Sequence, residues 1–276
     1  GPDDVAETMA WPSVVGLGEM MNFPGILGST VHAHGEVGAT LEAGKIVTGH
    51  YSMPETDRGL NAYIASGVRC CHESTRPEDV LAKMRLGMYA QLRYGSAWKD
   101  LPVLAEAVLA NDIDTRFATL VSDDTHPHTL VADGHLDHIG LGIDAVTAIQ
   151  MVTINCAQCF QMDHDLGSIA PGKCADIVFL DDLEDLRVTR VLIDGDVVAL
   201  SNLATQQAYL CEVGCSKVEV LRDRLLDIDP EAEVIAVPRF LDDSFRDELF
   251  ERVVGPVLQE RPTDVLICGC ADSFPA

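Results

Sequence analysis

Histidine and carboxylate residues recur at the ends of apolar segments in the first half of the chain. The residues that could bind a metal ion or transfer a proton there are Glu19, His50, His72 with Glu73, and Asp123 with Asp124. Imidazole nitrogens and carboxylate oxygens form the ligand sets of hydrolytic divalent metal sites, and a carboxylate can also bridge two ions. The pattern therefore predicts a hydrolytic metal centre. The alternative is that these side chains are separate and merely hydrogen-bonded.

Short apolar segments alternate with stretches of helical length in the same part of the chain. We expect strands at 14–19, 45–50, 68–72, 88–93 and 117–121, and helices at 36–43, 60–65, 77–86, 101–109 and 145–161. This alternation predicts an α/β fold with a parallel sheet, either a barrel or a doubly wound sheet. Active sites of such barrels lie at the carboxyl ends of the strands, where these residues would meet. Because a closed barrel needs eight βα units, the five units predict a partial (β/α)8 TIM-like barrel.

After residue 163 the pattern changes to short apolar segments that are joined by turns. Strands are expected at 167–169, 175–180 and 188–193, followed by a helix at 217–228, a strand at 234–237, a helix at 244–253 and a strand at 265–268. We therefore expect three parts: the partial barrel at 1–163, a small β remnant at 164–198, and a partial Rossmann-like α/β tail at 199–276.

The composition is typical of a soluble globular protein with many acidic residues. The formal net charge of −25 disfavours nucleic acid and anionic membrane surfaces as partners. No apolar run approaches the roughly 20 residues of a membrane helix, and no secretory signal is found. The nine cysteines are scattered, which favours a reducing, cytoplasmic location over a disulfide framework.

Several segments resemble adenine deaminase, a member of the amidohydrolase superfamily. They are Gly16-Leu-Gly-Glu-Met-Met-Asn-Phe-Pro-Gly25, Thr48-Gly-His-Tyr51, Cys70-Cys-His-Glu-Ser74, Ser122-Asp-Asp-Thr-His-Pro-His128, Ala157-Gln-Cys-Phe160 and Gly167-Ser-Ile-Ala-Pro-Gly-Lys-Cys-Ala-Asp-Ile-Val178. The resemblance runs from Gly1 to Val198. It implies metal-dependent hydrolysis of adenine to hypoxanthine and ammonia, with Mn²⁺ or Fe²⁺, or else Zn²⁺, as the cofactor and a small purine as the substrate.

By this resemblance Glu19 would bridge two metal ions, and His50 and His72 would bind one of them. Asp123 would lie on the last strand as a further metal ligand, and it would shuttle the proton of the attacking hydroxide, with Asp124 as the alternative for this shuttle. Glu73 could have either of two roles. It could protonate the purine ring or the leaving amine, or it could instead orient His72.

The chain begins after the strand that carries the family's His-x-His pair. His32-Ala33-His34 follows no apolar strand, so we expect it in a loop or at a helix start, outside the metal cluster. The resemblance therefore implies a truncated enzyme with impaired activity, and an open sheet predicts self-association into a homo-oligomer. A non-catalytic orphan fragment is the alternative.

Two histidines and two cysteines could each have either a functional or a purely structural role. His126 and His128 could touch substrate or could lie in a solvated loop. Cys156-x-x-Cys159 has the spacing of a metal or redox site, but its apolar surroundings favour buried packing. We expect all the cysteines to be structural.

From Asp194 onward the sequence resembles the ThiF-type adenylyltransferases. The stretch from Asp194 to Leu203, Val213-Gly214, Asp229-Pro230 and the end of the chain from Asp264 carry this resemblance. It implies that Asp196, Lys217 and Asp272 would contact ATP and its magnesium ion. The family's Gly-rich phosphate loop should precede Asp194, and no such motif follows a strand there. An ATP-dependent adenylyltransferase fragment is therefore the alternative function.

Overall fold

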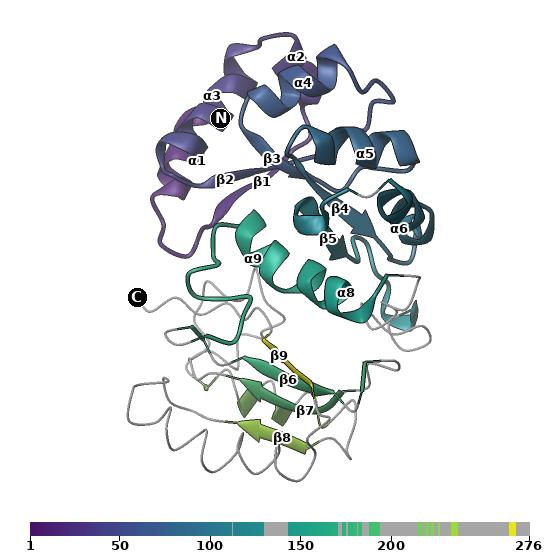
Figure 1. The fold of residues 1–276 in the computed structure, drawn as a ribbon. Coiled ribbons are helices and arrows are strands. Elements are labelled where there is room, and N and C mark those ends of the chain that lie inside the picture. Colours follow the sequence, from purple (N-terminus) through teal and green to yellow (C-terminus); the bar gives the residue numbers. More distant parts are fainter. Residues whose placement is uncertain are drawn as a thin grey trace. The chain divides into compact units, whose positions relative to one another are not determined.

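The computed structural model describes most of the first 180 residues and short segments of the remainder. The described ranges are 1–111, 113–129, 143–170, 173–174, 176–180, 182–183, 188–193, 215–216, 219–220, 222–223, 226, 233–236 and 265–268. The chain divides into two compact units, Gly1–Asp163 and His164–Pro275 (Figure 1). The three-part division stays a prediction.

The first unit contains a parallel sheet whose strands follow one another in chain order. The strands are β1 (Gly16–Met20), β2 (Ile46–Gly49), β3 (Val68–Cys71), β4 (Tyr89–Arg93) and β5 (Ala118–Val121). Their order is β1-β2-β3-β4-β5, and each neighbouring pair is parallel. A doubly wound sheet reverses its strand order at a switch point, whereas a barrel does not. The predicted α/β class is confirmed, and the strand order is that of consecutive barrel units.

Helices connect these strands and cover the sheet (Figure 1). Those between the strands are α2 (Phe23–Leu27), α3 (Val31–Glu42), α4 (Arg58–Ala65), α5 (Pro77–Arg85), α6 (Leu101–Ala110) and the 3₁₀ turn η1 (Thr115–Phe117). Helix α1 (Pro2–Met9) was not predicted from the sequence, although it begins with a proline followed by Asp3 and Asp4 in its first turn. Such residues favour a helix start, and α1 packs against α3.

The apolar stretch expected as one helix at 145–161 forms two. Helix α8 (Ala145–Val152) and helix α9 (Ile154–Cys159) are separated by Thr153, whose backbone has φ −121° and ψ −93°. The Thr153 hydroxyl donates a hydrogen bond to the Ile149 carbonyl at 2.6 Å. Threonine side chains that bond back to the preceding turn bend helices. The prediction of a single continuous helix was wrong.

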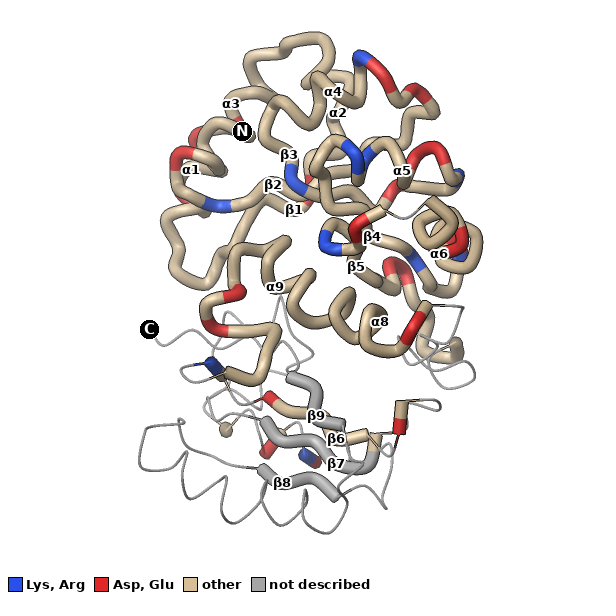
Figure 2. Tube along the Cα trace, viewed as in Figure 1, with Lys and Arg blue, Asp and Glu red and all other residues tan. Residues whose placement is uncertain are grey.

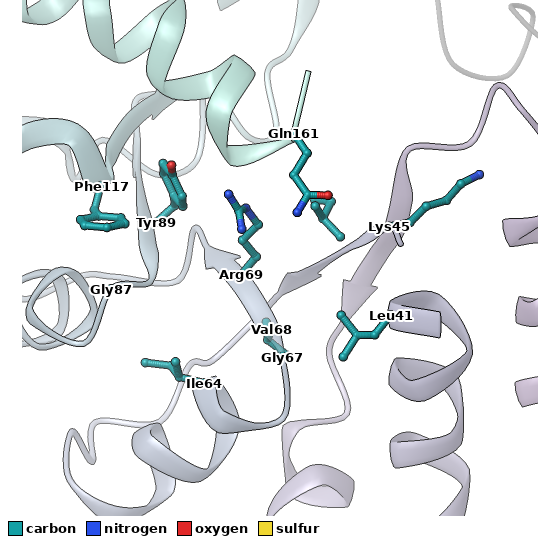
Figure 3. A pocket seen from close by; sticks show the side chains of 11 residues that line it. Leu41, Lys45, Ile64, Gly67, Val68, Arg69, Gly87, Tyr89, Phe117 and Gln161 are labelled. Carbon is teal, nitrogen blue, oxygen red and sulfur yellow. The ribbon is translucent and has the colours of Figure 1, made fainter. Parts of the chain in front are cut away.

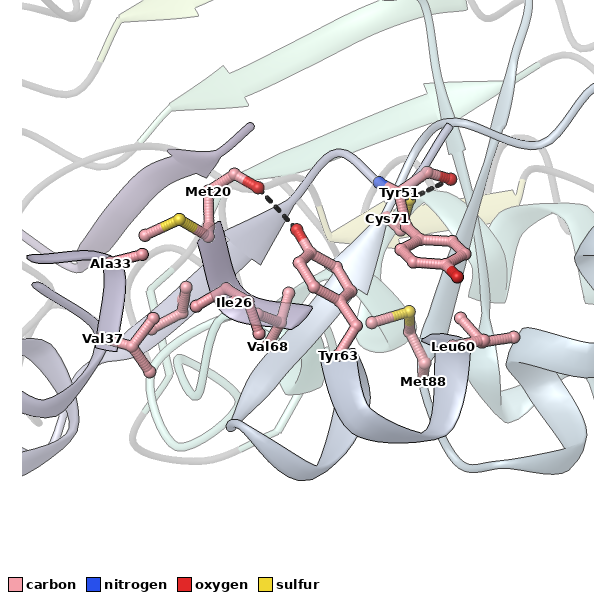
Figure 4. Packing of buried hydrophobic residues seen from close by; sticks show 11 residues of the cluster. Met20, Ile26, Ala33, Val37, Tyr51, Leu60, Tyr63, Val68, Cys71 and Met88 are labelled. Atoms are coloured by element: carbon pink, nitrogen blue, oxygen red, sulfur yellow. Dashed lines mark hydrogen bonds between the residues drawn. The ribbon is translucent and has the colours of Figure 1, made fainter. Parts of the chain in front are cut away.

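An apolar core fills the space between the strands and helices α2–α4 (Figure 4). Strand residues Val47 and Val68 pack there with Leu60 and Tyr63 of α4, and all four are almost completely buried. The Tyr63 hydroxyl donates a hydrogen bond to the Met20 carbonyl at 2.6 Å. The core therefore ties helix α4 to the carboxyl end of β1.

The second unit contains a four-stranded mixed sheet. Its strands are β6 (Ile177–Leu180), β7 (Val188–Ile193), β8 (Glu233–Ala236) and β9 (Val265–Cys268), in the order β8-β7-β6-β9. Strand β6 is antiparallel to β7 and β9, and β7 is parallel to β8. Strands on both sides of residue 198 thus share one sheet.

Two other expectations concern this unit. The strand expected at 167–169 is wrong, since these residues form a bend in which Gly167 has φ +84°. Within the helix expected at 217–228, residues 219–220, 222–223 and 226 are helical. The helix expected at 244–253 lies outside the described residues.

Charged side chains are spread over many elements of the first unit. Figure 2 shows acidic residues on several helices and loops, with basic residues interspersed among them. In the part of the chain that the structure describes, no helix has the length and apolar character needed to cross a bilayer.

Candidate metal centre

The carboxyl ends of the parallel strands bring the predicted site residues together. Glu19 lies near the end of β1, His50 directly follows β2, His72 follows β3, and Asp123 follows β5. Because parallel strands all end at the same edge of a sheet, residues at these positions are neighbours in space.

Glu19, His50 and His72 form one group of possible ligands. Glu19 Oε1 lies 3.2 Å from His50 Nδ1, and Glu19 Oε2 lies 3.4 Å from His72 Nε2. The two imidazole rings meet edge to face with centroids 5.1 Å apart. One nitrogen or oxygen atom from each residue lies within 4.8 Å of the others. A single carboxylate thus faces both imidazoles.

Glu73 and Asp123 form a second group with His72, again with one atom each within 4.8 Å. Glu73 Oε1 lies 3.5 Å from His72 Nε2 and 3.8 Å from His50 Nδ1. The two groups share His72, so the imidazoles stand between the Glu19 carboxylate and the carboxylates that could transfer protons.

Arg93 contacts two of the site carboxylates and was not predicted from the sequence. It ends β4, the one strand of the sheet for which no site residue was predicted, and its side chain is 1% exposed. Its guanidinium binds Glu73 and Asp123, as well as Asp100 before α6. Burial lowers the pKa of Arg93, but the charge of Glu73 and the hydrogen bonds with Asp123 and Asp100 outweigh it, so the pKa is raised. One signal for Arg93 was available in the sequence. It is an arginine at the end of an expected strand, and the other four strands of that sheet end at acidic residues or histidines.

Asp123 has an unusual backbone conformation, and both of its carboxylate oxygens accept hydrogen bonds. Its φ of +57° lies in the left-handed region, which aspartate tolerates better than most residues. Its Oδ1 accepts a hydrogen bond from the Asp124 amide at 2.8 Å, and its Oδ2 accepts one from Arg93 at 3.0 Å. Asp124 is exposed and belongs to neither ligand group of the described residues.

Buried polar side chains hold the loops that carry the two histidines. The Tyr63 hydroxyl accepts a hydrogen bond from the His50 amide at 3.0 Å while donating to Met20. The Lys83 ammonium, which is 2% exposed, donates to the carbonyls of Tyr51 and Glu73 and to the Ser74 hydroxyl. Each of these bonds joins a helix to the last residue of a strand or to the segment that follows a strand. Neither residue was predicted from the sequence.

The residues fit a divalent metal ion. The donor set of two imidazoles and a carboxylate suits Mn²⁺, Fe²⁺ or Zn²⁺. His50 Nδ1 is buried and makes no hydrogen bond within the described residues, although Glu19 and Glu73 lie near it. A buried polar nitrogen without a hydrogen-bond partner is costly, and a metal ion bound to it would remove this cost.

The other histidines have partners of their own. His32 and His34 lie in the first turn of α3, where His32 Nε2 is 3.1 Å from Glu36 Oε1 and His34 Nε2 is 3.0 Å from the Ile26 carbonyl. The exposed rings of His126 and His128 stack on each other with centroids 5.5 Å apart.

The described cysteines of the first unit are packed into the protein. Cys70 and Cys159 are buried together beside Tyr89, with Phe117 and Phe160 against them. Cys156 Sγ contacts the Met151 carbonyl at 3.3 Å. These contacts suit a structural role.

A pocket of about 290 Å³ lies at the opposite edge of the sheet from the cluster (Figure 3). Its lining includes Ile46, Val68 and Tyr89, which begin β2, β3 and β4, together with Arg69. Arg69 Nε and Nη2 donate to the carbonyls of Cys159 and Gln158 at 2.7 and 2.9 Å. The guanidinium therefore binds the last carbonyls of helix α9, as basic side chains at helix C-termini commonly do.

The predicted nucleotide contacts Asp196, Lys217 and Asp272 lie outside the described residues. Their roles stay predictions.

Comparison with protein families identifies two segments. Residues 128–198 match the model of the amidohydrolase family, and residues 189–276 match that of the ThiF family. The two matches overlap at 189–198, which contain Asp194, where the resemblance was expected to change.

Similar proteins are adenine deaminases. That of Clostridium botulinum (strain ATCC 19397 / Type A) is 70% identical over 210 residues, which cover 74% of this chain and 35% of the relative. That of Moorella thermoacetica is 52% identical over 204 residues, covering 72% of this chain and 34% of the relative. Adenine deaminase 3 of Rhizobium meliloti is 38% identical over 270 residues, covering 95% of this chain and 44% of the relative. This last alignment extends into residues 199–276.

The chain spans about a third of the length of the first two relatives. A crystal structure of an amidohydrolase superposes on 70% of this chain and 57% of its own, with a TM-score of 0.47 and 15% sequence identity. The family matches and the adenine deaminase relatives confirm the resemblances expected from the sequence. Over about three quarters of its length the chain is homologous to adenine deaminases of the amidohydrolase superfamily, and a ThiF-like segment forms its carboxyl end.

Proposed function

We propose that the cluster at the carboxyl edge of the sheet catalyses metal-dependent hydrolytic deamination of adenine to hypoxanthine and ammonia. The observation that carries this proposal is the placement of Glu19, His50 and His72 within 4.8 Å of one another, directly beside Glu73 and Asp123. The 70% identity to an adenine deaminase supplies the substrate. A small purine is therefore the proposed partner of the site.

Glu19, His50 and His72 are the side chains that would hold the ion, and Mn²⁺ or Fe²⁺ are the proposed metals, with Zn²⁺ as the alternative. When bound, such an ion lowers the pKa of a coordinated water and supplies hydroxide near neutral pH. Glu19 would orient both imidazoles, since its two oxygens lie 3.2 and 3.4 Å from their nitrogens.

The remaining carboxylates would move the protons. The reaction forms a carbon–oxygen bond from water and breaks the carbon–nitrogen bond to the exocyclic amine, which leaves as ammonia. Asp123 would accept a proton from the water, and Glu73 would deliver a proton to the purine ring or to the leaving amine. The proximity of Glu73 Oε1 to His72 Nε2, at 3.5 Å, also allows it to orient that imidazole.

A single-turnover assay tests the proposal even if turnover is slow. The chain is loaded with Mn²⁺, mixed with adenine at a lower concentration than the protein, and hypoxanthine and ammonia are followed together. We expect stoichiometric formation of both products, and at least a hundredfold slower reaction for Asp123→Asn. Asp124→Asn is the matched control and should react at nearly the wild-type rate. Equal losses in both variants would contradict the assignment of Asp123, and an inert wild-type chain that binds Mn²⁺ would contradict the proposed reaction.

The ThiF match at 189–276 favours a second candidate, ATP-dependent adenylyl transfer by the tail. Asp196, Lys217 and Asp272 would be its nucleotide contacts. Binding of MgATP to the chain, measured by isothermal titration and lost in Lys217→Ala, would support this candidate. No binding of MgATP by the wild-type chain would contradict it.

A homo-oligomer is a further proposal. Within the described residues, β1 and β5 each pair with one strand only. Exposed sheet edges favour pairing with another chain. Sedimentation velocity over a range of concentrations should show self-association, and a monomer at every concentration would contradict it.

A further inference from the structure

Arg93 joins three carboxylates that come from three different parts of the chain. Its Nη1 donates to Glu73 Oε1 at 2.6 Å and to Asp123 Oδ2 at 3.0 Å, and its Nη2 donates to Asp100 Oδ2 at 3.0 Å. Trp98 lies over the guanidinium, with 4.8 Å between the Arg93 Cζ and the ring centroid. The guanidinium is therefore held by three hydrogen bonds from Nη1 and Nη2 and by an aromatic ring beside Cζ.

One nitrogen atom thus binds both side chains that could transfer protons. Asp100 binds Nη2 of Arg93, and this bond opposes movement of Nη1 toward either Glu73 or Asp123 alone. A guanidinium suits this task because its donors form a rigid planar fork, whereas an ammonium is a single point of charge. Arg93 therefore sets the separation between the Glu73 and Asp123 carboxylates.

Glu73 has a second possible position. Its Oε1 already lies 3.5 Å from His72 Nε2 and 3.8 Å from His50 Nδ1, close to the proposed metal ligands. Without the bond from Arg93, nothing in the described contacts of Oε1 would oppose its rotation toward an ion held between the two imidazoles. A carboxylate bound to the metal could no longer deliver a proton.

We propose that Arg93 is a positioning residue that holds Glu73 and Asp123 as a proton-transfer pair and keeps Glu73 off the metal. The role of Glu73 and Asp123 as a proton-transfer pair rests on the proposed function. The restraint that Arg93 places on Glu73 concerns metal binding alone.

The first test measures the Mn²⁺ dissociation constant by competition with a chelator. Arg93→Met should bind Mn²⁺ about tenfold more tightly, because Glu73 becomes available as a further negatively charged ligand. In a Glu73→Gln background the same substitution should produce much less tightening. A residue that only stabilises the fold would weaken Mn²⁺ binding when removed. Arg116→Met is the matched control, because Arg116 is an exposed arginine paired with Asp114 on η1.

Weaker or unchanged Mn²⁺ binding by Arg93→Met would overturn the proposal, as would tightening that is just as large in the Glu73→Gln background. If Arg93→Met does not fold, as judged by circular dichroism, Arg93→Lys takes its place. Lysine keeps the positive charge but lacks the planar fork of separate nitrogens that spans these carboxylates, so tightening of the same sign is expected.

The second test follows single-turnover deamination of adenine. Arg93→Lys should lower the rate at least about a hundredfold, as expected when a preorganised donor is lost. In an Asp123→Asn background, the same substitution should cost much less, since residues that act as a unit are not additive. Full activity of Arg93→Lys, or fully additive losses, would overturn the positioning role. An inactive wild-type chain would contradict the proposed reaction. The Mn²⁺ measurements would then still decide whether Arg93 restrains Glu73.

Discussion

Glu19 Oε1 and His50 Nδ1 lie 3.2 Å apart at the ends of neighbouring parallel strands. Elsewhere in the chain, Glu36 Oε1 and His32 Nε2 lie 3.1 Å apart on the surface of one helix. The two pairs have nearly the same separation but different surroundings. The Glu19 carboxylate faces a second imidazole, and the His50 side chain is 22% exposed, whereas the His32 side chain is 65% exposed. Only the first pair is placed to share an ion.

This contrast predicts the effect of removing one carboxylate charge. Glu19→Gln should weaken Mn²⁺ binding by at least about a hundredfold, because the carboxylate that faces both imidazoles is lost. Glu36→Gln is the matched control and should leave the dissociation constant unchanged. Isothermal titration with Mn²⁺ measures both. Similar affinities for Glu19→Gln and the wild type would show that Glu19 is not a ligand.

Metal should also stabilise the folded protein. Mn²⁺ at about one hundred times its dissociation constant should raise the free energy of unfolding by about 2.7 kcal/mol, because it binds the folded state alone. Urea unfolding with and without Mn²⁺ measures this difference. His72→Ala should abolish the stabilisation, and the double variant His32→Ala/His34→Ala should retain it. Stabilisation that survives in His72→Ala would place the ion elsewhere.

Tyr63 couples the first two strand ends, so its hydroxyl should matter to both stability and metal binding. Tyr63→Phe removes the bonds to the Met20 carbonyl and the His50 amide. Leaving these buried groups unpaired should cost about 1–3 kcal/mol of stability, and Mn²⁺ binding should weaken about tenfold. Tyr51→Phe, which loses a bond to Glu55, should lower stability less and leave Mn²⁺ affinity unaltered. If both variants bind Mn²⁺ equally well, the coupling through Tyr63 is absent.

The buried ammonium of Lys83 should contribute much more than an exposed lysine. Lys83→Met leaves the carbonyls of Tyr51 and Glu73 without this donor, and we expect a loss of about 2–4 kcal/mol in the free energy of unfolding. Lys45 donates to a single carbonyl, that of Trp11, at an exposed site. Lys45→Met should therefore change stability by less than about 0.5 kcal/mol. Comparable losses in the two variants, measured by urea unfolding, would contradict this reading of Lys83.

Local sequence patterns were sufficient to predict the parallel sheet and the placement of four site residues. Apolar segments of strand length alternate with helical stretches, and this alternation requires parallel strands whose carboxyl ends meet at one edge. Glu19, His50, His72 and Asp123 stand at those ends, so their proximity follows from the sequence and this geometric rule. Their roles as ligands and proton carriers stay predictions.

The tertiary structure decided which other charged residues join the site. Arg93 and Lys83 are almost completely buried, and a buried charge is tolerated only where partners surround it. The partners of Arg93 are Glu73, Asp100 and Asp123. They come from separate segments, and no periodicity or spacing in the sequence pairs them. The break at Thr153 could not be predicted either, because the apolar pattern continues across it from α8 into α9. The sequence by itself determined where the strands end, and only the folded chain determined which charges those ends bring into contact.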